Sequence, residues 1–243
     1  MPERRTVPAG RDLPLRRQLA LACRVVAMEG HNDAIWGHVS VRRPGEDVFW
    51  IKAAGMGLEE ATAANVQLID LDGRRLLGPG IVHTELPIHS EIYRRRPEVG
   101  AVVHTHPVFA TVLGAAGHRI RPVTHEGALF FPPDIPLFDQ TTDLILTREL
   151  GEAVAAALGD QPALLLKNHG IVVAGRTLEE AACWACLLEK GARAQVFALA
   201  LGAPAWTGAE EALLKRKHIY HDQALAFLWQ YYCRKLRRQG MLS

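Results

Sequence analysis

Several features that would assign the chain to a special class are scarce or missing in its 243 residues. Four cysteines, at positions 23, 183, 186 and 233, are too few for a disulfide-stabilised scaffold. No apolar run approaches the roughly 20 residues that a membrane span needs, and the N-terminal segment MPERRTVPAGRD lacks the apolar stretch of a signal peptide. A net charge of +2 is too small to indicate a nucleic-acid partner. We therefore expect a cytoplasmic protein that binds neither membranes nor nucleic acid.

Linkers, repeats and low-complexity segments are also missing, so nothing divides the sequence. Its composition, 49% hydrophobic and 22% charged, is close to that of an ordinary globular protein, and the length is sufficient to bury a core. We expect one domain over residues 1–243, in which residues 1–12 form a loose N-terminal arm. The motif Cys183-Trp184-Ala185-Cys186 lies inside a helical pattern without a second cysteine pair. We interpret its thiols as core residues rather than redox or metal-binding groups.

The spacing of apolar residues predicts an alternation of helices and strands. Helical spacing predicts helices over residues 13–28, 85–96, 141–158, 178–201 and 210–238. Short apolar or alternating runs predict strands over residues 38–41, 48–51, 66–71, 99–105, 163–166 and 171–173, and residues 115–139 are rich in turn formers. Because strands and helices interleave without a strict βαβ rhythm, we expect an α/β fold with a mixed sheet between helices.

The histidine pair of His104-Thr105-His106 follows the apolar run of residues 99–103. Side chains alternate along a strand, so residues two apart point to one face. Pro107 ends the strand at an edge where a substrate could reach the pair. Two imidazoles side by side are suitable ligands for a transition metal. A pair with this spacing also occurs in proteins without a metal, so it does not establish a site alone.

A third histidine lies at a comparable place, in the turn Lys167-Asn168-His169-Gly170 between two apolar strands. Taken alone, His169 can equally be a hydrogen-bonded turn residue. Three imidazoles at strand ends would leave some metal positions open, which is the arrangement of catalytic rather than structural sites.

An acidic residue opens the helix predicted over residues 85–96. Thr84 has the character of an N-cap, Glu85 lies in the first turn, and Pro87 is compatible with that turn. Glu85 can therefore be simply a favourable charge at a helix start. His89 follows four residues later on the same side of the helix, and we interpret it as a structural, hydrogen-bonded residue.

Four segments together resemble one family. The segments GHVSVR, IKAAGMG, HTELPIHSEIYRRRPEVGAVVHTHP and LLLKNHGIVVAGRTLEEA occur in this order, and over roughly residues 13–201 the sequence is similar to the class II aldolase/adducin family. The resemblance implies an α/β/α sandwich with a central mixed, mainly antiparallel sheet flanked by helices. It also implies a homotetramer with active sites between neighbouring subunits.

The resemblance extends to the chemistry of the site. In this family the HxH pair and the later histidine hold a divalent metal ion, which here implies His104, His106 and His169 as ligands of one ion per subunit. Imidazole ligands suit Zn²⁺, Mn²⁺, Fe²⁺ or Co²⁺. The acidic residue that opens the helix matches Glu85 and would be the catalytic acid or base. The implied reaction is cleavage of a carbon–carbon bond in a small-molecule substrate by a lyase.

The chain departs from the family where sugar-phosphate members bind phosphate. Those members use an Asn in a GNxS turn, a Thr-Gly pair and a Ser-Ser pair; this chain has His38, Ala54-Gly55 and His83-Thr84. Phosphate needs several hydrogen-bond donors, whereas imidazoles suit a carboxylate or phenolic oxygen. The pattern is closer to members that decarboxylate hydroxylated aromatic or heteroaromatic acids. The predicted substrate-binding residues are His38, Gly55, His83 and Thr84.

Two further residues are candidates for substrate contact. His125 lies in the loop-rich stretch where related enzymes place a polar group, and Tyr220 lies near the C-terminus, where some relatives send a tyrosine into a neighbour's site. Each can also be an ordinary surface or loop residue.

We expect a metal-dependent decarboxylase of a non-phosphorylated hydroxy acid. One alternative is an aldolase or epimerase acting on a sugar or sugar phosphate. The other is a non-catalytic module like the adducin head domain, which lacks the metal-binding histidines that this chain has.

Overall fold

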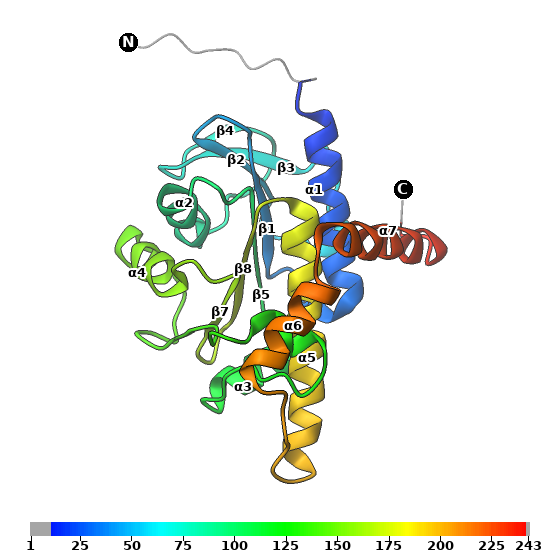
Figure 1. Ribbon diagram of the computed structural model, residues 1–243. Helices are drawn as coiled ribbons and strands as arrows, with labels where there is room; N and C mark the ends of the chain where they lie inside the picture. Colours follow the sequence, from blue (N-terminus) through cyan, green and yellow to red (C-terminus); the bar gives the residue numbers. More distant parts are fainter. Residues whose placement is uncertain (1–10, 242–243) are drawn as a thin grey trace.

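A central sheet of eight strands runs through the structure, a computed structural model that describes residues 11–241 (Figure 1). The strands have the spatial order β4-β3-β2-β1-β5-β8-β7-β6. Each neighbouring pair is antiparallel except β6 and β7, which are parallel. The expected mixed, mainly antiparallel sheet is therefore confirmed. The strands span β1 His38–Arg42, β2 Val48–Lys52, β3 Val66–Asp70, β4 Arg75–Leu77, β5 Ala101–Thr105, β6 Leu137–Phe138, β7 Ala163–Leu166 and β8 Gly170–Gly175.

Helices cover both faces of the sheet, which gives the expected α/β/α sandwich (Figure 1). On one face α2 and α4 pack against each other. On the opposite face α5 lies at the centre and contacts α1, α3 and α7, while α6 packs against the short turn η3. The helices span α1 Leu13–Val26, α2 Leu86–Arg95, α3 Val108–Ala115, α4 Arg148–Leu158, α5 Leu178–Ala200, α6 Ala209–Ile219 and α7 Asp222–Arg238; the short turns are η1 Ala27–His31, η2 Leu58–Glu60 and η3 Glu126–Phe130.

Alternation along the central strands sends side chains to the two helical layers. In β5, Val103 packs into the core beside α5, whereas Val102 packs into the core beside α2 and α4. β1 pairs with β5 in a register that sets Ser40 opposite Val102 and His38 opposite His104. The side chains of His38, Ser40 and His104 therefore share the face that α2 covers.

The helix predicted over residues 141–158 is shorter, because α4 begins only at Arg148. Thr147 is its N-cap, and the hydroxyl oxygen of Thr147 accepts a hydrogen bond from the Leu150 backbone N–H at 3.3 Å. The preceding segment is irregular and turns the backbone N–H of Ile145 toward the side chain of Glu85. The prediction was wrong there because apolar spacing does not reveal that a backbone N–H is used outside the helix.

The helix predicted over residues 210–238 is in fact two helices, α6 and α7. Tyr220 leaves helical geometry, with φ −110° and ψ 41°. The Nδ1 atom of His221 then accepts a hydrogen bond from the Ala224 backbone N–H at 3.3 Å and caps the start of α7. The sequence analysis also missed the edge strand β4 and helix α3.

The expected N-terminal arm falls mostly on residues 1–10, which lie outside the described residues. Asp12, the last residue of the expected arm, is buried. Its carboxylate pairs with Arg43 at 3.3 Å and accepts a hydrogen bond from the Trp50 indole at 3.2 Å. Within residues 11–241, none of the helices combines the length and the apolar character that crossing a bilayer requires.

We expect Gly151→Ala to weaken the contact between α4 and α2. A Cβ atom at Gly151 would lie 2.6 Å from the carbonyl oxygen of Pro87, which is closer than packed atoms allow. The variant should lose about 1–3 kcal/mol of unfolding free energy, the usual cost of overpacking, and thermal unfolding followed by circular dichroism measures this loss. Gly208→Ala is the matched control, because a Cβ there meets no atom within 4 Å. Equal unfolding temperatures for the two variants would contradict this packing.

Candidate metal centre

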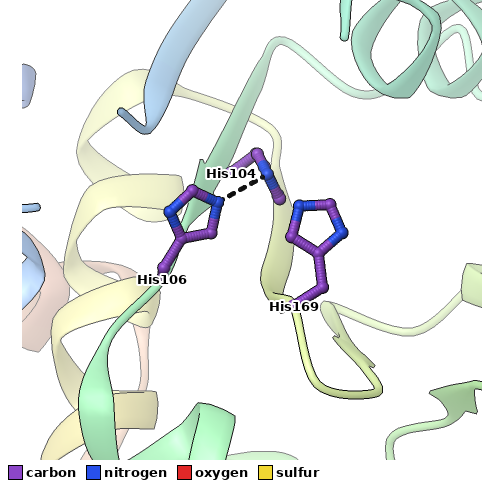
Figure 2. A group of neighbouring side chains, drawn as sticks. All are labelled: His104, His106 and His169. Atoms are coloured by element: carbon purple, nitrogen blue, oxygen red, sulfur yellow. Dashed lines mark hydrogen bonds between the residues drawn. The ribbon is translucent and has the colours of Figure 1, made fainter. Parts of the chain in front are cut away.

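Three imidazole rings from different parts of the chain converge at one end of the central strands (Figure 2). His104 lies in β5, His106 follows just beyond the end of that strand, and His169 lies in the turn between β7 and β8. Their ligand nitrogens all lie within 4.8 Å of one another. The structure thus brings together the three histidines that were predicted from the sequence.

The hydrogen bonds of two of these rings determine which nitrogen faces the centre. The Nδ1 atom of His104 lies 2.9 Å from the carbonyl oxygen of Ile171, and the Nδ1 atom of His106 lies 2.9 Å from the carboxylate of Asp33. Since both partners are acceptors, each Nδ1 carries a hydrogen, and in the tautomer that is neutral with this hydrogen each Nε2 bears a lone pair. The two Nε2 atoms lie 3.2 Å apart, along the dashed line in Figure 2. Two lone pairs this close repel each other, and a cation between them removes the repulsion.

These positions fit the coordination shell of a divalent metal ion. Ligand atoms about 2.0–2.1 Å from a tetrahedral ion lie about 3.3–3.4 Å from each other. The His104 Nε2 atom lies 3.2 Å from that of His106 and 3.6 Å from Oε2 of Glu85. Burial lowers the pKa of His106 to about 4, so its ring is neutral, as a metal ligand must be. The Nε2 atom of His169 is buried without a hydrogen-bond partner among the described residues, so no protein group competes with a metal for it.

Glu85 lies on the remaining side of the histidine cluster and is only 6% exposed. Its Oε1 atom accepts a hydrogen bond from the Ile145 backbone N–H at 2.8 Å and lies 3.6 Å from Nε2 of His169. Burial raises the pKa of Glu85, but the surrounding histidines, chiefly His104 and His169, outweigh burial and hold that pKa far below its ordinary value. The side chain is therefore an anion, the form that can bind a metal.

The start of α2 differs from the prediction. Glu85, not Thr84, is the N-cap residue, with φ −92° and ψ 31°, and its side chain caps no backbone N–H of the helix. Thr84 is exposed. The Glu85 carboxylate faces the histidine cluster instead of the helix end, because the Ile145 backbone holds it there.

His38 and His83 lie beside the cluster. His38 is directly opposite His104 across the β1–β5 pair, and their ring centroids are 4.9 Å apart. The centroid of His83 lies 4.5 Å from that of His38. Burial, and next the charge of Lys52, lowers the pKa of His83 to about 3, so its ring is neutral. Its Nε2 atom is buried without a hydrogen-bond partner among the described residues, which leaves it available to a substrate.

The other two predicted substrate-binding residues of this region flank these histidines. Gly55 is exposed in the loop after β2 and has a φ of +75°, which favours glycine. The backbone N–H of Ala54 donates to the carbonyl of Ile81 at 3.0 Å, which ties this loop to the segment that leads into His83. Thr84 and His83 line a cavity of about 390 Å³ at the start of α2.

His125 and Tyr220 lie together in another place. Both line a cavity of about 320 Å³ that also includes Trp184 of α5 and residues of α7. The described residues of the histidine cluster do not line this cavity. Within one chain, the structure does not bring these two candidates to the three histidines.

The sequence analysis did not identify two residues that orient the histidine cluster. Asp33, in the segment before β1, accepts the Nδ1 hydrogen of His106, and partners of this kind fix the orientation of metal-binding imidazoles. The Nδ1 atom of His31 lies 2.8 Å from the hydroxyl of Thr105, the residue between the two paired histidines. No pattern in the sequence distinguishes Asp33 from other aspartates, because its role depends on a contact across 73 residues.

Known proteins resemble this chain in sequence and in fold. The family model described as class II aldolase and adducin N-terminal domain matches residues 17–196. A 3,4-dihydroxyphthalate decarboxylase from Arthrobacter keyseri is 36% identical over 180 residues, which cover 68% of this chain and 71% of that protein. Decarboxylase NovR from Streptomyces niveus is 34% identical over 209 residues, which cover 84% of this chain and 77% of that protein.

A solved structure extends the likeness over almost the whole chain. L-Fuculose 1-phosphate aldolase from Glaciozyma antarctica PI12 has a TM-score of 0.84 at 27% identity, and the match covers 99% of this chain and 95% of that one. The similarity therefore includes both decarboxylases and an aldolase.

We predict that Asp33→Asn weakens metal binding. The amide lacks the negative charge that holds the Nδ1 hydrogen of His106, so the affinity for metal should fall about 10- to 100-fold. Titration of metal-free protein with Zn²⁺ against a competing chelator measures this affinity. His106→Ala removes a ligand altogether and should lose more affinity than Asp33→Asn.

Asp47→Asn is the matched control for this titration, because Asp47 is exposed and the variant has the same change of charge. It should bind Zn²⁺ as the wild type does. An affinity for Zn²⁺ equal to that of the wild type in Asp33→Asn, or full metal occupancy in His106→Ala, would contradict this description of the metal centre.

Proposed function

The chain belongs to the class II aldolase and adducin family, and on that premise we propose that it is a metal-dependent decarboxylase of a non-phosphorylated, hydroxylated aromatic or heteroaromatic carboxylic acid. The observation that carries the proposal is the pair of neutral imidazoles, His38 and His83, beside the metal ligand His104. The similarity to relatives named 3,4-dihydroxyphthalate decarboxylase and decarboxylase NovR supports the same type of reaction.

One divalent ion per subunit would be held by His104, His106 and His169, with Glu85 close enough to join them. This donor set suits Zn²⁺, Mn²⁺, Fe²⁺ or Co²⁺. When bound, such an ion stabilises the negative charge that develops on a substrate oxygen.

Glu85 is the group that we assign to the proton. Because the Ile145 backbone holds its Oε1, Oε2 remains directed toward His104 and His38. The carboxylate takes the proton of the substrate hydroxyl group. The bond between the ring carbon and the carboxyl carbon then breaks, CO₂ leaves, and the electron pair stays on the ring carbon. Glu85 returns the proton to that carbon, and the product regains a hydroxyl proton from water after release.

His38 and His83 are the residues that we assign to the departing carboxylate. Burial is the main cause that lowers the pKa of each ring, so both rings are neutral, each with one N–H to donate. A neutral donor holds a carboxylate less strongly than a cation does, so less binding energy is lost when the charge leaves the carboxyl group as CO₂ forms. His38 and Glu85 are almost fully buried, which keeps water from the carbon that receives the proton.

An aldolase or epimerase that acts on a sugar or sugar phosphate is the second candidate. The likeness to L-fuculose 1-phosphate aldolase over 99% of this chain favours it. Glu85 could serve either reaction, because aldol cleavage and decarboxylation both leave an electron pair on carbon. The two candidates differ at the acidic end of the substrate, where His38 and His83 stand in place of an amide and a hydroxyl.

We further propose a cytoplasmic homotetramer with active sites at subunit interfaces and no nucleic-acid or membrane partner. Large apolar side chains are exposed along α5, α6, α7 and the segment after α5, as expected of a surface that a neighbour covers: Phe197, Leu201, Trp206, Leu213, Leu214 and Phe227. The cavity of His125 and Tyr220 is formed by the same group of helices and would become part of a site once a neighbouring subunit is added. The cysteines are free thiols, which suits the reducing cytoplasm.

We predict that Glu85→Gln retains the fold and the metal but loses roughly 10²–10⁴-fold in turnover, the usual size of a general acid/base contribution. The amide can still accept the Ile145 N–H but cannot carry a proton from oxygen to carbon. Turnover is measured as CO₂ release, and metal content by elemental analysis. Glu149→Gln, at an exposed position on α4, is the control. Near-wild-type turnover in Glu85→Gln would remove Glu85 from the mechanism.

We predict that metal-reconstituted protein releases CO₂ from 3,4-dihydroxyphthalate or a related hydroxylated aromatic acid and does not cleave L-fuculose 1-phosphate. The double variant His38→Asn/His83→Ser restores an amide and a hydroxyl at the acidic end of the site. Its KM for the aromatic acid should rise, with a smaller change in kcat, because the lost contact is made both before and during the reaction.

The same assays separate the two candidate functions. Preferential cleavage of the phosphorylated sugar by wild type would replace the decarboxylase with the aldolase. An unchanged KM in the double variant would mean that neither histidine binds the substrate's acidic end.

A further inference from the structure

Helix α2 and strand β1 face each other with polar side chains at matching intervals. On α2, His89 and Tyr93 follow Glu85 at intervals of four residues, which places all three on one side of the helix. On β1, His38 and Ser40 are two residues apart and point toward α2. Four of these side chains lie inside the protein: Ser40 and His89 are 0% exposed, Tyr93 is 1% exposed and His38 is 3% exposed.

Three short contacts join these four side chains into one row. The Tyr93 hydroxyl lies 2.7 Å from Oγ of Ser40, and that Oγ lies 2.6 Å from Nδ1 of His89. The Nε2 atom of His89 lies 2.6 Å from Nδ1 of His38, whose own Nε2 faces Oε2 of Glu85 at 3.9 Å. Because the row ends at a buried phenol, it is not a path for protons from water. Its geometry suits a role in orienting His38.

Each contact in this row needs one hydrogen and one lone pair, so the hydrogen bonds can all be donated toward Glu85 or all be donated toward Tyr93. If they run toward Glu85, Tyr93 donates to Ser40, and Ser40 donates to Nδ1 of His89. The Nε2–H of His89 then donates to Nδ1 of His38. The hydrogen of His38 is consequently on Nε2, where it points at the Glu85 carboxylate. In this direction each of the three short contacts has one hydrogen and one lone pair, and the last hydrogen faces an anion at 3.9 Å.

The opposite direction leaves two groups unsatisfied. The Nε2 lone pair of His38 would face the anionic carboxylate of Glu85, and the two would repel. The Tyr93 hydrogen would have no acceptor, because Ser40 is the hydrogen-bond partner of that hydroxyl among the described residues. Burial lowers the pKa of His89 well below its ordinary value, so its ring is neutral and has one N–H to donate.

We propose that Tyr93, Ser40 and His89 are positioning residues that lock His38 in the tautomer with its hydrogen on Nε2. His38 then presents an N–H donor to Glu85 and, in a step that rests on the decarboxylase proposed above, to the carboxylate of the substrate. An amide in this place could turn either its oxygen or its nitrogen to the ligand. The locked imidazole offers a donor alone, so it selects an anionic oxygen.

Solid-state ¹⁵N NMR of histidine-labelled protein tests the proposal directly, because protonated and lone-pair ring nitrogens have well-separated chemical shifts. The signals of the two rings are assigned by their loss in His38→Asn and His89→Asn. In both metal-free and Zn²⁺-loaded protein we expect Nε2–H and an Nδ1 lone pair on His38 and on His89. A hydrogen on Nδ1 of His38 overturns the proposal, whichever substrate the protein uses.

Ser40→Asp reverses the direction of the row. The introduced carboxylate accepts the hydrogen of His89 from Nδ1, so Nε2 of His89 becomes an acceptor and His38 must donate from Nδ1. We expect this change in the ¹⁵N spectrum of His38. If Ser40→Asp folds and the ¹⁵N spectrum of His38 is unchanged, the role of Ser40 is overturned. If this variant does not fold, the wild-type spectrum alone decides which ring nitrogen of His38 carries the hydrogen.

Ser40→Ala supplies the kinetic test without adding a charge. We expect its KM for 3,4-dihydroxyphthalate to rise roughly three- to tenfold, the net worth of one hydrogen bond, with a smaller change in kcat. Thr111→Val is the control and should retain the wild-type KM, because it removes a buried hydroxyl that has no hydrogen-bond partner within residues 11–241. A lower unfolding temperature for Ser40→Ala with an unchanged KM marks a merely structural contact and overturns the proposal. If wild type does not use this substrate, the decarboxylase assignment fails, and the tautomer measurement still decides.

Discussion

The pairing register of β1 and β5 is the constraint on which the histidine cluster depends. It sets His38 opposite His104, and both side chains point to the layer of α2. Because successive side chains of a strand alternate, a slip of one residue would turn one of these rings toward α5. Val39 and Val103, which face the α5 layer, are fully buried in its core and oppose such a slip. The same apolar burial that stabilises the sheet therefore positions the imidazoles.

The cluster combines this position with an imbalance of charge. Glu85 is a buried anion, yet the groups around its carboxylate are imidazoles and one backbone N–H. His104 and His106 use their Nδ1 hydrogens elsewhere and turn lone pairs inward. A buried anion that faces the lone pairs of His104 and His106 is costly unless a cation compensates it. The proposed binding of a divalent ion and the burial of Glu85 would therefore be two parts of one electrostatic arrangement.

Local patterns were sufficient to predict most of the strands and helices, because alternation and turn signals depend on neighbours in sequence. The convergence of the three histidines was implied by the family resemblance. Contacts between distant segments could not be predicted in this way. Asp33 contacts His106, which lies 73 residues away in the sequence. His89 and Ser40 come into contact only when α2 packs on β1. The break at Tyr220 was missed for a different reason. Apolar spacing continues through Tyr220, whereas the break depends on the cap that begins α7.

The β7–β8 hairpin makes two contributions to the cluster from adjoining residues. It carries His169 in its turn, and two residues later the carbonyl of Ile171 holds the ring of His104. The conformational entropy lost in ordering this backbone is lost once, although it fixes one imidazole and aims another. Any displacement of the hairpin moves both together. The rings of His104 and His169 consequently keep or lose their relative geometry as a unit, so the hairpin would make these two proposed metal ligands act cooperatively.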